Sequence, residues 1–191
     1  MNTDTFFESS KAKQIALNAT EKVRLERPDA GKSIEICVEK GAIRIGADTG
    51  KEIGDLTLAF ACKSENCKFN YPQDLDIKIE ALADTTYLIR HTNKIKTNEG
   101  DAIVDWIIQL HMVRLERKLE DRLMMLFYLL ATRLGKRTAK GLELDHILSH
   151  ARIAEITGST RSTISRTISK LRKIEKIIID DLKNQLILPV D

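Results

Sequence analysis

The chain has 191 residues, of which 42% are hydrophobic and 31% charged, and its formal net charge is +3. This composition is that of a folded, water-soluble protein, and the length suits one large domain or two small ones. The longest apolar run, residues 123–131, has nine residues, which excludes a membrane-spanning helix of about 20 residues. The N-terminus lacks a basic-then-apolar signal, so we expect a cytoplasmic protein whose three cysteines are reduced.

The net positive charge lies in the C-terminal half. Residues 1–98 hold 15 basic and 15 acidic side chains, whereas residues 133–176 hold 11 basic and 4 acidic ones, a local net charge of +7. A basic block is most often a solvated face, but it is also the footprint of a phosphate-binding surface. Charge alone leaves both interpretations open.

The first part of the chain predicts a β domain. We interpret residues 1–27 as a short helical or irregular lead-in. The alternation in the runs 34–46 and 76–82, with two further runs at 56–62 and 85–89, predicts half-buried antiparallel strands. A small barrel or sandwich is the economical arrangement for such strands. Four glycines are expected at turns or bulges: Gly41, Gly46, Gly50 and Gly54.

A helical period follows in residues 98–116. Apolar residues recur there at spacings of three and four, which is compatible with a coiled-coil seam. Ile108, Met112 and Leu115 widen the apolar surface, which favours a dimerisation helix over a core helix of the monomer. The predicted dimer interface consists of Ile103, Trp106, Ile107, Leu110 and Val113.

Residues 117–137 predict a second, buried helix. Its centre is densely apolar, and Gly135 with basic neighbours is typical of a helix C-terminus. We interpret its methionines and phenylalanine as core side chains rather than as a cofactor site.

The next segment predicts a helix-turn-helix. Ser149 can cap a short helix that ends at Gly158, and Thr160 can cap a second helix from 161 to about 173. The apolar residues of the second helix gather on one side, while the opposite side carries arginine, lysine and serine and has no glutamate before Glu175. Such a face suits the major groove of DNA, where arginine pairs with guanine edges and hydroxyl or ammonium groups bind phosphate.

Residues 177–188 predict a β-hairpin, because two β-branched runs flank a polar turn. A helix-turn-helix followed by a hairpin is a winged helix. Two roles of the hairpin stay open, a wing that contacts phosphate and a strand pair that covers the core.

No catalytic or metal motif is present. The four histidines, His91, His111, His146 and His150, are scattered, and the sequence has no Ser/His/Asp constellation and no phosphate-cradling loop. We therefore expect neither an enzyme nor a metal site.

The order of these elements resembles the CRP/FNR family of bacterial transcription regulators. Within that family, the run from Gly158 to Arg166 is most similar to the global nitrogen regulators of cyanobacteria. The resemblance implies an α+β protein with a shortened cyclic-nucleotide-binding-like barrel, a long dimerisation helix and a C-terminal winged helix. The implied boundaries are 1–97, 98–116 and 117–191.

The resemblance also implies a function and site residues. The chain is expected to be a dimeric regulator that reads a near-palindromic site in double-stranded DNA, with RNA polymerase or a regulatory protein as a further candidate partner. Arg161, Ser162 and Arg166 occupy the base-reading positions, and Ser162 stands where several members carry an acid. Phosphate contacts are expected from Ser149, Thr160, Thr163, Ser165, Ser169, Lys170 and Lys173.

The sensor half departs from the family, and we expect no cofactor. The run that holds a cyclic nucleotide in some members is matched only by Gly54-Asp55-Leu56, followed by Lys63-Ser64 where an arginine is needed. Three cysteines cannot supply a four-cysteine iron–sulfur site. His111 is a conceivable haem ligand, but a hydrogen bond at an interface is the commoner role.

Two other functions stay open at this point. One is a non-specific, architectural DNA-binding protein, which the small net charge of the whole chain fits poorly. The other is an interaction module whose β domain docks a partner protein. Salt-dependent binding to one palindrome over scrambled duplex separates a sequence-specific regulator from both.

Overall fold

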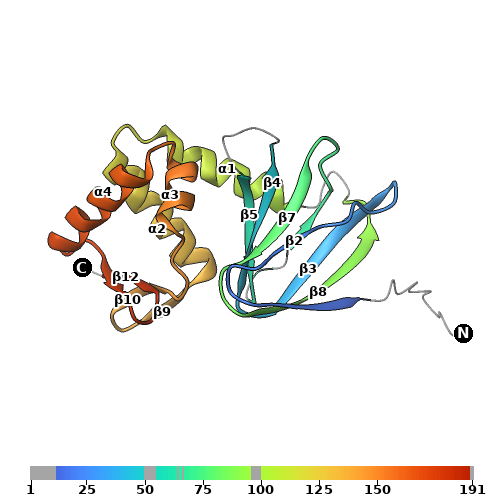
Figure 1. Cartoon of the computed structure of the whole chain (residues 1–191), viewed down its shortest axis with the longest axis horizontal. Coiled ribbons are helices and arrows are strands. Elements are labelled where there is room, and N and C mark those ends of the chain that lie inside the picture. The colour runs from blue at the N-terminus through green and yellow to red at the C-terminus, as the bar shows by residue number, and fades with distance from the viewer. Residues whose placement is uncertain (1–11, 50–54, 64, 66, 96–99, 190–191) are drawn as a thin grey trace, which may run out of the picture.

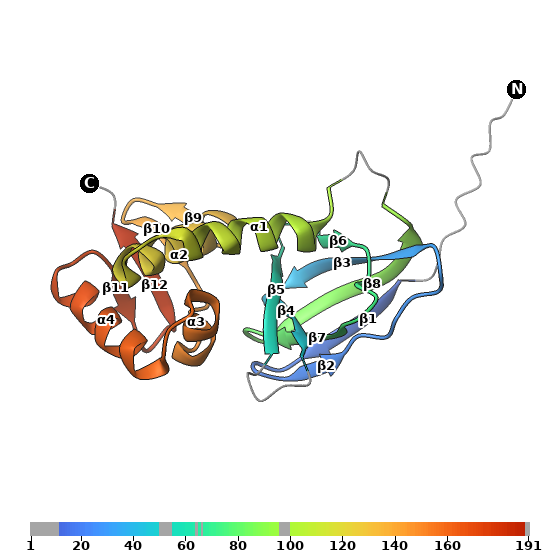
Figure 2. The ribbon, with the colours of Figure 1, turned by 90° about the horizontal axis from the view of Figure 1, so that it is seen from above.

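The computed structural model describes residues 12–49, 55–63, 65, 67–95 and 100–189. A β domain and a mostly helical domain lie at opposite ends of the molecule, and one long helix runs between them (Figures 1 and 2). This is the α+β architecture that the sequence predicts. The lead-in residues 1–11 and the expected turn or ligand positions Gly50, Gly54 and Ser64 lie outside the described residues.

The β domain consists of two four-stranded antiparallel sheets, in the orders β1-β8-β3-β6 and β2-β7-β4-β5. Aliphatic side chains fill the space between the sheets, among them Ile36, Ile45 and Ile79, each fully buried. The four predicted strand runs are all present. The strands are β1 (Lys13–Leu17), β2 (Lys22–Arg24), β3 (Lys32–Lys40), β4 (Ala42–Asp48), β5 (Asp55–Cys62), β6 (Cys67–Phe69), β7 (Asp76–Ala81) and β8 (Thr85–Asn93).

The expectation of a helical or irregular lead-in over residues 1–27 is wrong for the described part, residues 12–27. Strands β1 and β2 are edge strands, paired with β8 and β7. Most of their side chains are exposed or half-buried, so they show little of the alternation by which a strand is recognised. Their conformation is fixed by backbone hydrogen bonds to distant strands, and a local pattern does not reveal those partners.

The helical domain has a four-stranded sheet of its own, in the order β11-β12-β10-β9. The hairpin of β11 and β12 is the one that the sequence predicts, whereas β9 and β10 were not expected. The elements are α2 (Leu119–Leu134), β9 (Lys136–Thr138), β10 (Gly141–Leu144), α3 (His150–Thr157), α4 (Arg161–Lys173), β11 (Ile178–Asp180) and β12 (Gln185–Pro189).

Two glycines are required for different reasons. Gly41 joins β3 to β4 with a φ of +79°, which only glycine adopts without strain. Gly135 ends α2, as predicted, but its φ is −98° and its conformation is an ordinary one. A Cβ at Gly135 would collide with the carbonyl oxygens of Ala131 and Glu143, so a side chain is excluded there by the close approach of β10.

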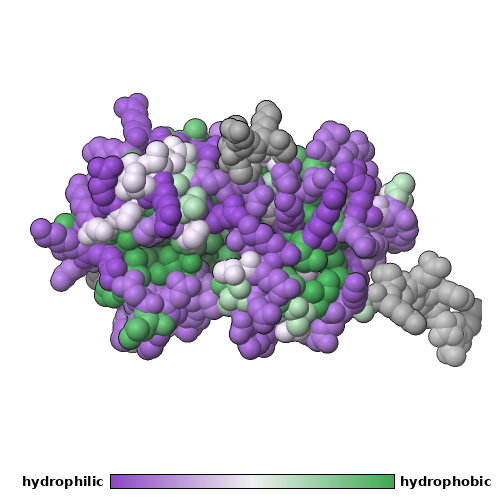
Figure 3. All heavy atoms as spheres, in the orientation of Figure 1, coloured by the Kyte–Doolittle hydropathy of each residue, from purple (hydrophilic) through white to green (hydrophobic). Residues whose placement is uncertain are grey.

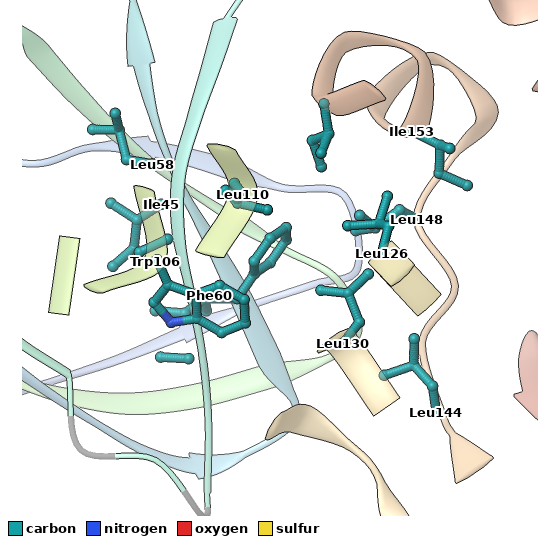
Figure 4. Packing of buried hydrophobic residues seen from close by; sticks show 14 of the residues in the cluster. Ile45, Leu58, Phe60, Trp106, Leu110, Leu126, Leu130, Leu144, Leu148 and Ile153 are labelled. Carbon is teal, nitrogen blue, oxygen red and sulfur yellow. The ribbon is translucent and has the colours of Figure 1, made fainter. Parts of the chain in front are cut away.

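The long helix α1 (Ala102–Leu115) begins at Asp101, whose carboxylate accepts hydrogen bonds from the backbone N–H groups of Ile103 and Val104. Its inner face packs into the protein. Trp106 is fully buried and meets Phe60 of β5 edge-on, with ring centroids 5.2 Å apart. Leu110 lies between these rings and the apolar side chains of α2 and α3 (Figure 4). One continuous apolar cluster therefore joins the two domains.

This packing corrects the predicted dimer interface. Ile103, Trp106, Leu110 and Val113 are all buried inside the chain, at 8% exposure or less, so they cannot meet a second copy. Only Ile107 of the predicted set is open to solvent. A different apolar stripe of α1 is exposed to solvent, with residue exposures of 43–61%: Val104, Ile107, Ile108, Met112 and Leu115. The 3–4 spacing did identify an apolar face, but it was the face that forms the core.

We predict that Tyr87→Phe stabilises the β domain. The Tyr87 hydroxyl is fully buried and has no hydrogen-bond partner among the described residues, and such a group costs about 1–3 kcal/mol. Burial also raises the pKa of Tyr87 to about 12. Above about pH 10 only the unfolded chain ionises this phenol, so the native protein loses stability as the pH rises. The free energy of unfolding of the variant should exceed that of the wild type by about 1 kcal/mol at pH 7. Between pH 9 and 11 it should fall less than that of the wild type.

Urea unfolding at both ends of that pH range measures the effect. Tyr71→Phe is the matched control, because the Tyr71 hydroxyl donates to the Leu25 carbonyl and accepts from the Ile77 N–H, both at 3.2 Å. The control should lose stability. A loss of stability in Tyr87→Phe as well would contradict the assignment of an unpaired hydroxyl.

Candidate DNA-binding interface

The helix-turn-helix is held by local caps. The Ser149 hydroxyl accepts a hydrogen bond from the Arg152 N–H at the start of α3, and the Thr160 hydroxyl accepts from the Thr163 N–H at the start of α4. Gly158 lies between the helices with φ +68° and ψ +40°, the left-handed conformation that ends α3. These are the caps and the turn that the sequence predicts.

Two arginines fix the far end of α3 to the rest of the domain. Arg114 of α1 donates to the carbonyls of Ile156 and Glu155, at 2.8 and 2.7 Å. Arg122 of α2 donates to the Thr157 carbonyl at 3.1 Å. The last carbonyls of a helix lack intrahelical partners and carry partial negative charge, so guanidinium groups suit them well. Sequence reasoning missed both residues, since their partners are backbone atoms more than thirty positions away.

Helix α4 has the two faces that the sequence predicts. Ile164, Ile168 and Leu171 are buried, at 3% exposure or less, against α2 and α3. The outer face carries the three predicted base-reading residues, and Arg161, Ser162 and Arg166 are all exposed. We call the outer surface of α4 the reading face.

The arginines of the reading face are available to a ligand. Within the described part of the chain, neither Arg161 nor Arg166 forms an ion pair; the Arg166 Nε donates only a long bond, 3.4 Å, to the Ser162 carbonyl. An exposed arginine without a carboxylate partner keeps its N–H donors free for phosphate or for a guanine edge. The space-filling view shows how hydrophilic this end of the molecule is around a small apolar hollow (Figure 3).

The residues that are predicted to contact phosphate differ in their exposure and in the hydrogen bonds of their side chains. Lys173 and Ser169 are exposed, although the Ser169 hydroxyl donates to the Ser165 carbonyl at 3.0 Å. Thr160 and Thr163 use their hydroxyls in the cap of α4, where their oxygens are 2.8 Å apart. Contacts of these residues with phosphate stay predictions.

Lys170 is tied to the neighbouring helix. Its ammonium pairs with Glu120 of α2, and this hydrogen bond lowers the pKa of the Glu120 carboxyl. The pair draws the lysine toward α2, to the side of the reading face. A phosphate contact at Lys170 therefore competes with an existing ion pair.

The turn of the wing is acidic. It carries Asp180 and Asp181 against a single lysine, Lys183, and Asp181 pairs with Arg172 of α4 at 3.0 Å. Leu182 at the tip is 99% exposed. Two carboxylates repel a phosphate backbone, so of the two roles left open for the hairpin, covering the core fits this turn better.

In the β domain, Lys63 stands at the position where nucleotide-binding members of the family are expected to carry an arginine for the phosphate. Asp55, the acid of the run that matches nucleotide-binding members, points toward the helical domain and pairs with Arg152 of α3 at 3.2 Å. Lys22 and Lys78 lie 3.7 and 3.9 Å from the same carboxylate. Its negative charge is thus already satisfied by protein cations.

The described residues offer neither a metal-binding cluster nor a membrane span. Among them, no group of three or more His, Cys, Asp and Glu side chains could hold a metal ion. None of the helices in the described ranges is long and apolar enough to cross a membrane.

A capped helix-turn-helix with a cationic outer face and a hairpin behind it is a winged-helix domain. Comparison with known proteins agrees: residues 121–188 match the family described as Crp-like helix-turn-helix domain. The chain is also 31% identical over 136 residues to a probable transcriptional activator of Rhizobium leguminosarum bv. viciae. That match covers 71% of this chain and 53% of the relative, so the chain spans about half the length of the curated relative.

Solved structures share the fold of most of the chain. A CRP-family transcriptional regulator from Thermus thermophilus aligns over 93% of this chain and 92% of its own, with a TM-score of 0.63 at 16% identity. FixK2 from Bradyrhizobium japonicum aligns over the same fractions, with a TM-score of 0.62 at 18% identity. The resemblance to CRP/FNR regulators is confirmed for the helix-turn-helix domain and for the fold. A closer relation to the cyanobacterial nitrogen regulators stays a prediction.

Proposed function

We propose that this protein is a dimeric, sequence-specific DNA-binding transcription regulator of the CRP/FNR type. The observation that carries the proposal is the reading face of α4 in a Crp-like domain, where Arg161 and Arg166 are exposed and form no ion pair with any described residue. Residues 1–97 serve as a sensor-like domain, 98–116 as the dimerisation helix and 117–191 as the DNA-binding domain. The protein acts in the cytoplasm, where bacterial DNA is accessible.

The residues of the reading face have separate tasks in this proposal. Arg161, Ser162 and Arg166 lie in the N-terminal half of α4, which is the part of a recognition helix that contacts base edges. Ser165, Ser169 and Lys173 contact phosphate or bind through water. Because the Gly158–Arg166 run is similar to that of the cyanobacterial nitrogen regulators, we also propose that the DNA half-site is related to the half-site of those regulators. RNA polymerase or a regulatory protein is the further partner that a regulator of this type needs.

The dimer forms on the exposed stripe of α1 rather than on the stripe that the sequence indicated. Three residues of this stripe, Val104, Ile108 and Leu115, form with His111 a row at spacings of four, three and four, which is the repeat of a coiled-coil seam. All four are exposed. A second copy related by a two-fold axis buries the same stripe on both chains and presents two reading faces to half-sites about 34 Å apart.

We predict different effects of Arg166→Ala and Lys173→Ala. We expect the Arg166 guanidinium to donate two hydrogen bonds to one guanine edge, which is worth about 1–3 kcal/mol of discrimination against other bases. Its loss should therefore weaken binding to the preferred site and remove the base preference at one base pair per half-site. Loss of Lys173 should weaken all duplexes alike and reduce the salt slope by about 1 per contact.

The measurement is the dissociation constant on a duplex selected from a random pool and on its scrambled version, at several salt concentrations. Equal losses on both duplexes for both variants would mean that α4 contributes charge only. That result would leave the architectural role, or the protein-docking role, as the better account.

We predict that Ile108→Glu gives a folded monomer. The side chain is 56% exposed in a single chain, so a charge there costs little until a second copy covers it. Sedimentation at micromolar concentration should show dissociation, and affinity for the palindrome should fall by more than about tenfold, because the two half-sites then bind independently.

Gln109→Glu, which places the same charge on an exposed position outside the stripe, is the control and should leave the dimer intact. Leu110→Glu is a poor test of the interface, because this residue is buried within the chain. A wild-type protein that sediments as a monomer with and without DNA would contradict the proposal.

Finally, we predict that DNA binding needs no cyclic nucleotide. The Asp55 carboxylate is engaged by Arg152 of the helical domain, and Lys63 stands where family members use arginine to hold phosphate. Calorimetric titration with cyclic AMP and cyclic GMP should show no heat of binding, and neither should change the affinity for DNA. A micromolar dissociation constant for either nucleotide would refute this prediction.

A further inference from the structure

The last turn of α1 carries two different kinds of side chain. Leu115 belongs to the exposed apolar stripe on which the proposed dimer forms. Its neighbour Arg114 reaches instead to the C-terminal end of α3 and donates to backbone carbonyls there. The surface of the proposed dimer and the contact with the helix-turn-helix are therefore one residue apart in the chain.

The contact of Arg114 with α3 is a fork. Its Nε donates to the Ile156 carbonyl at 2.8 Å, and its Nη2 donates to the Glu155 carbonyl at 2.7 Å. Two donors that are held in one plane fix the direction of the partner as well as its distance. Because the two carbonyls are consecutive in α3, the fork restricts both sliding and rotation of α3 against α1.

A second fork holds the same junction from α2. Arg122 donates through Nε to the Glu116 carbonyl at 2.7 Å and through Nη1 to the Thr157 carbonyl at 3.1 Å. Glu116 is the first residue after α1, and Thr157 is the last residue of α3. The two arginines together bind the end of α1 and the last three carbonyls of α3. We call Arg114 and Arg122 the junction arginines.

The connection from α3 to the reading face is short and bonded. Gly158 takes the left-handed conformation, and the Ser159 N–H donates to the Ala154 carbonyl at 2.9 Å. Thr160 then caps α4, so three residues separate the end of α3 from Arg161, the first residue of the reading face. The position of the end of α3 therefore determines the position of the beginning of α4.

The distance between the two reading faces of a dimer depends on how each face is held on its own α1. One base pair more or less between the half-sites moves a half-site by about 3.4 Å along the duplex and turns it by about 35° around the axis. A dimer accepts both spacings only if its reading faces can follow that movement. Two forks at the junction oppose it.

We infer that the junction arginines are positioning residues, which hold the reading face at a fixed place relative to the dimer surface of α1 and thereby set the half-site spacing that the protein accepts. The inference rests on the proposed function, because it assigns a further specificity to the same surface. The tasks are divided: α4 reads the sequence of a half-site, and the junction arginines select the distance between two half-sites.

The test is Arg114→Ala in the full-length protein, on the selected palindrome and on versions with one base pair added to or removed from the spacer. The wild type should bind the altered spacers more than about tenfold more weakly, because the two half-sites are then not engaged together. In the variant this ratio should fall to about threefold or less, because the reading faces can shift to meet both half-sites. The base preference within each half-site should stay unchanged.

Arg114→Lys is the second variant. A lysine keeps the positive charge, but its single ammonium group lacks the planar fork that fixes orientation. It should therefore lose the spacer preference as Arg114→Ala does. Arg114 is exposed, and the inner face of α1 is formed by other side chains, so we expect both variants to fold. Circular dichroism checks the fold, and sedimentation checks that each variant is still a dimer.

Arg117→Ala is the matched control. Arg117 is exposed and forms no hydrogen bond or ion pair with any residue that the structure describes. The variant loses the same charge as Arg114→Ala, three positions further along, and leaves the junction intact. It should keep the spacer ratio of the wild type.

A wild-type spacer ratio in either folded Arg114 variant would overturn the inference while the proposed function stands. The same conclusion would follow if an Arg114 variant sedimented as a monomer, or if it lost base preference along with spacer preference, because the residue would then support the dimer contact or α4 itself. A wild type that binds every spacer equally would also overturn it. Absence of specific DNA binding in the wild type would overturn both the inference and the proposed function.

Discussion

The structure depends on a helix that is apolar on two faces. The inner face of α1 inserts Trp106 and Leu110 between the β domain and the helical domain, so that two small cores become one. The outer face leaves Ile108 and its neighbours in water. A helix that is apolar all round is normally buried on all sides. The first face explains why the domains are joined, and the second is the surface on which the proposed dimer would form.

The second constraint is electrostatic. The outer face of the sheet β2-β7-β4-β5 is covered by helices, and a buried arginine, Arg44, is part of that contact. Ion pairs at a domain boundary add little net stability because each charge gives up its water. They do specify geometry, since a charge without its partner is costly when buried. Apolar packing along α1 therefore supplies cohesion, while Arg44, through its pairs with Glu80 and Glu155, links α3 to this sheet.

The helix-turn-helix domain is the part that could be predicted best. Its signals are local: Ser149 and Thr160 as caps, Gly158 in a left-handed turn, and aliphatic residues at helical spacing. The β domain was predicted only where alternation marked a strand with one buried face. Strands β1 and β2 lie at sheet edges, and β9 and β10 are short pieces of a sheet completed by the C-terminal hairpin. Such strands owe their conformation to partners far along the chain.

From the sequence alone we could predict the helices, the strands with one buried face, the outer face of α4 and the presence of an apolar seam on α1, because each follows from residues that lie close together in the chain. Only the tertiary structure decided which side of α1 faces the core, since its two apolar stripes are alike in composition and differ in what packs against them. The same holds for Arg44, which stands between two isoleucines as a solvent-facing residue of a strand would. It is buried because Glu155, more than a hundred positions later, lies on the helix that covers it. Charge pairing across such a separation leaves no periodic trace in the sequence.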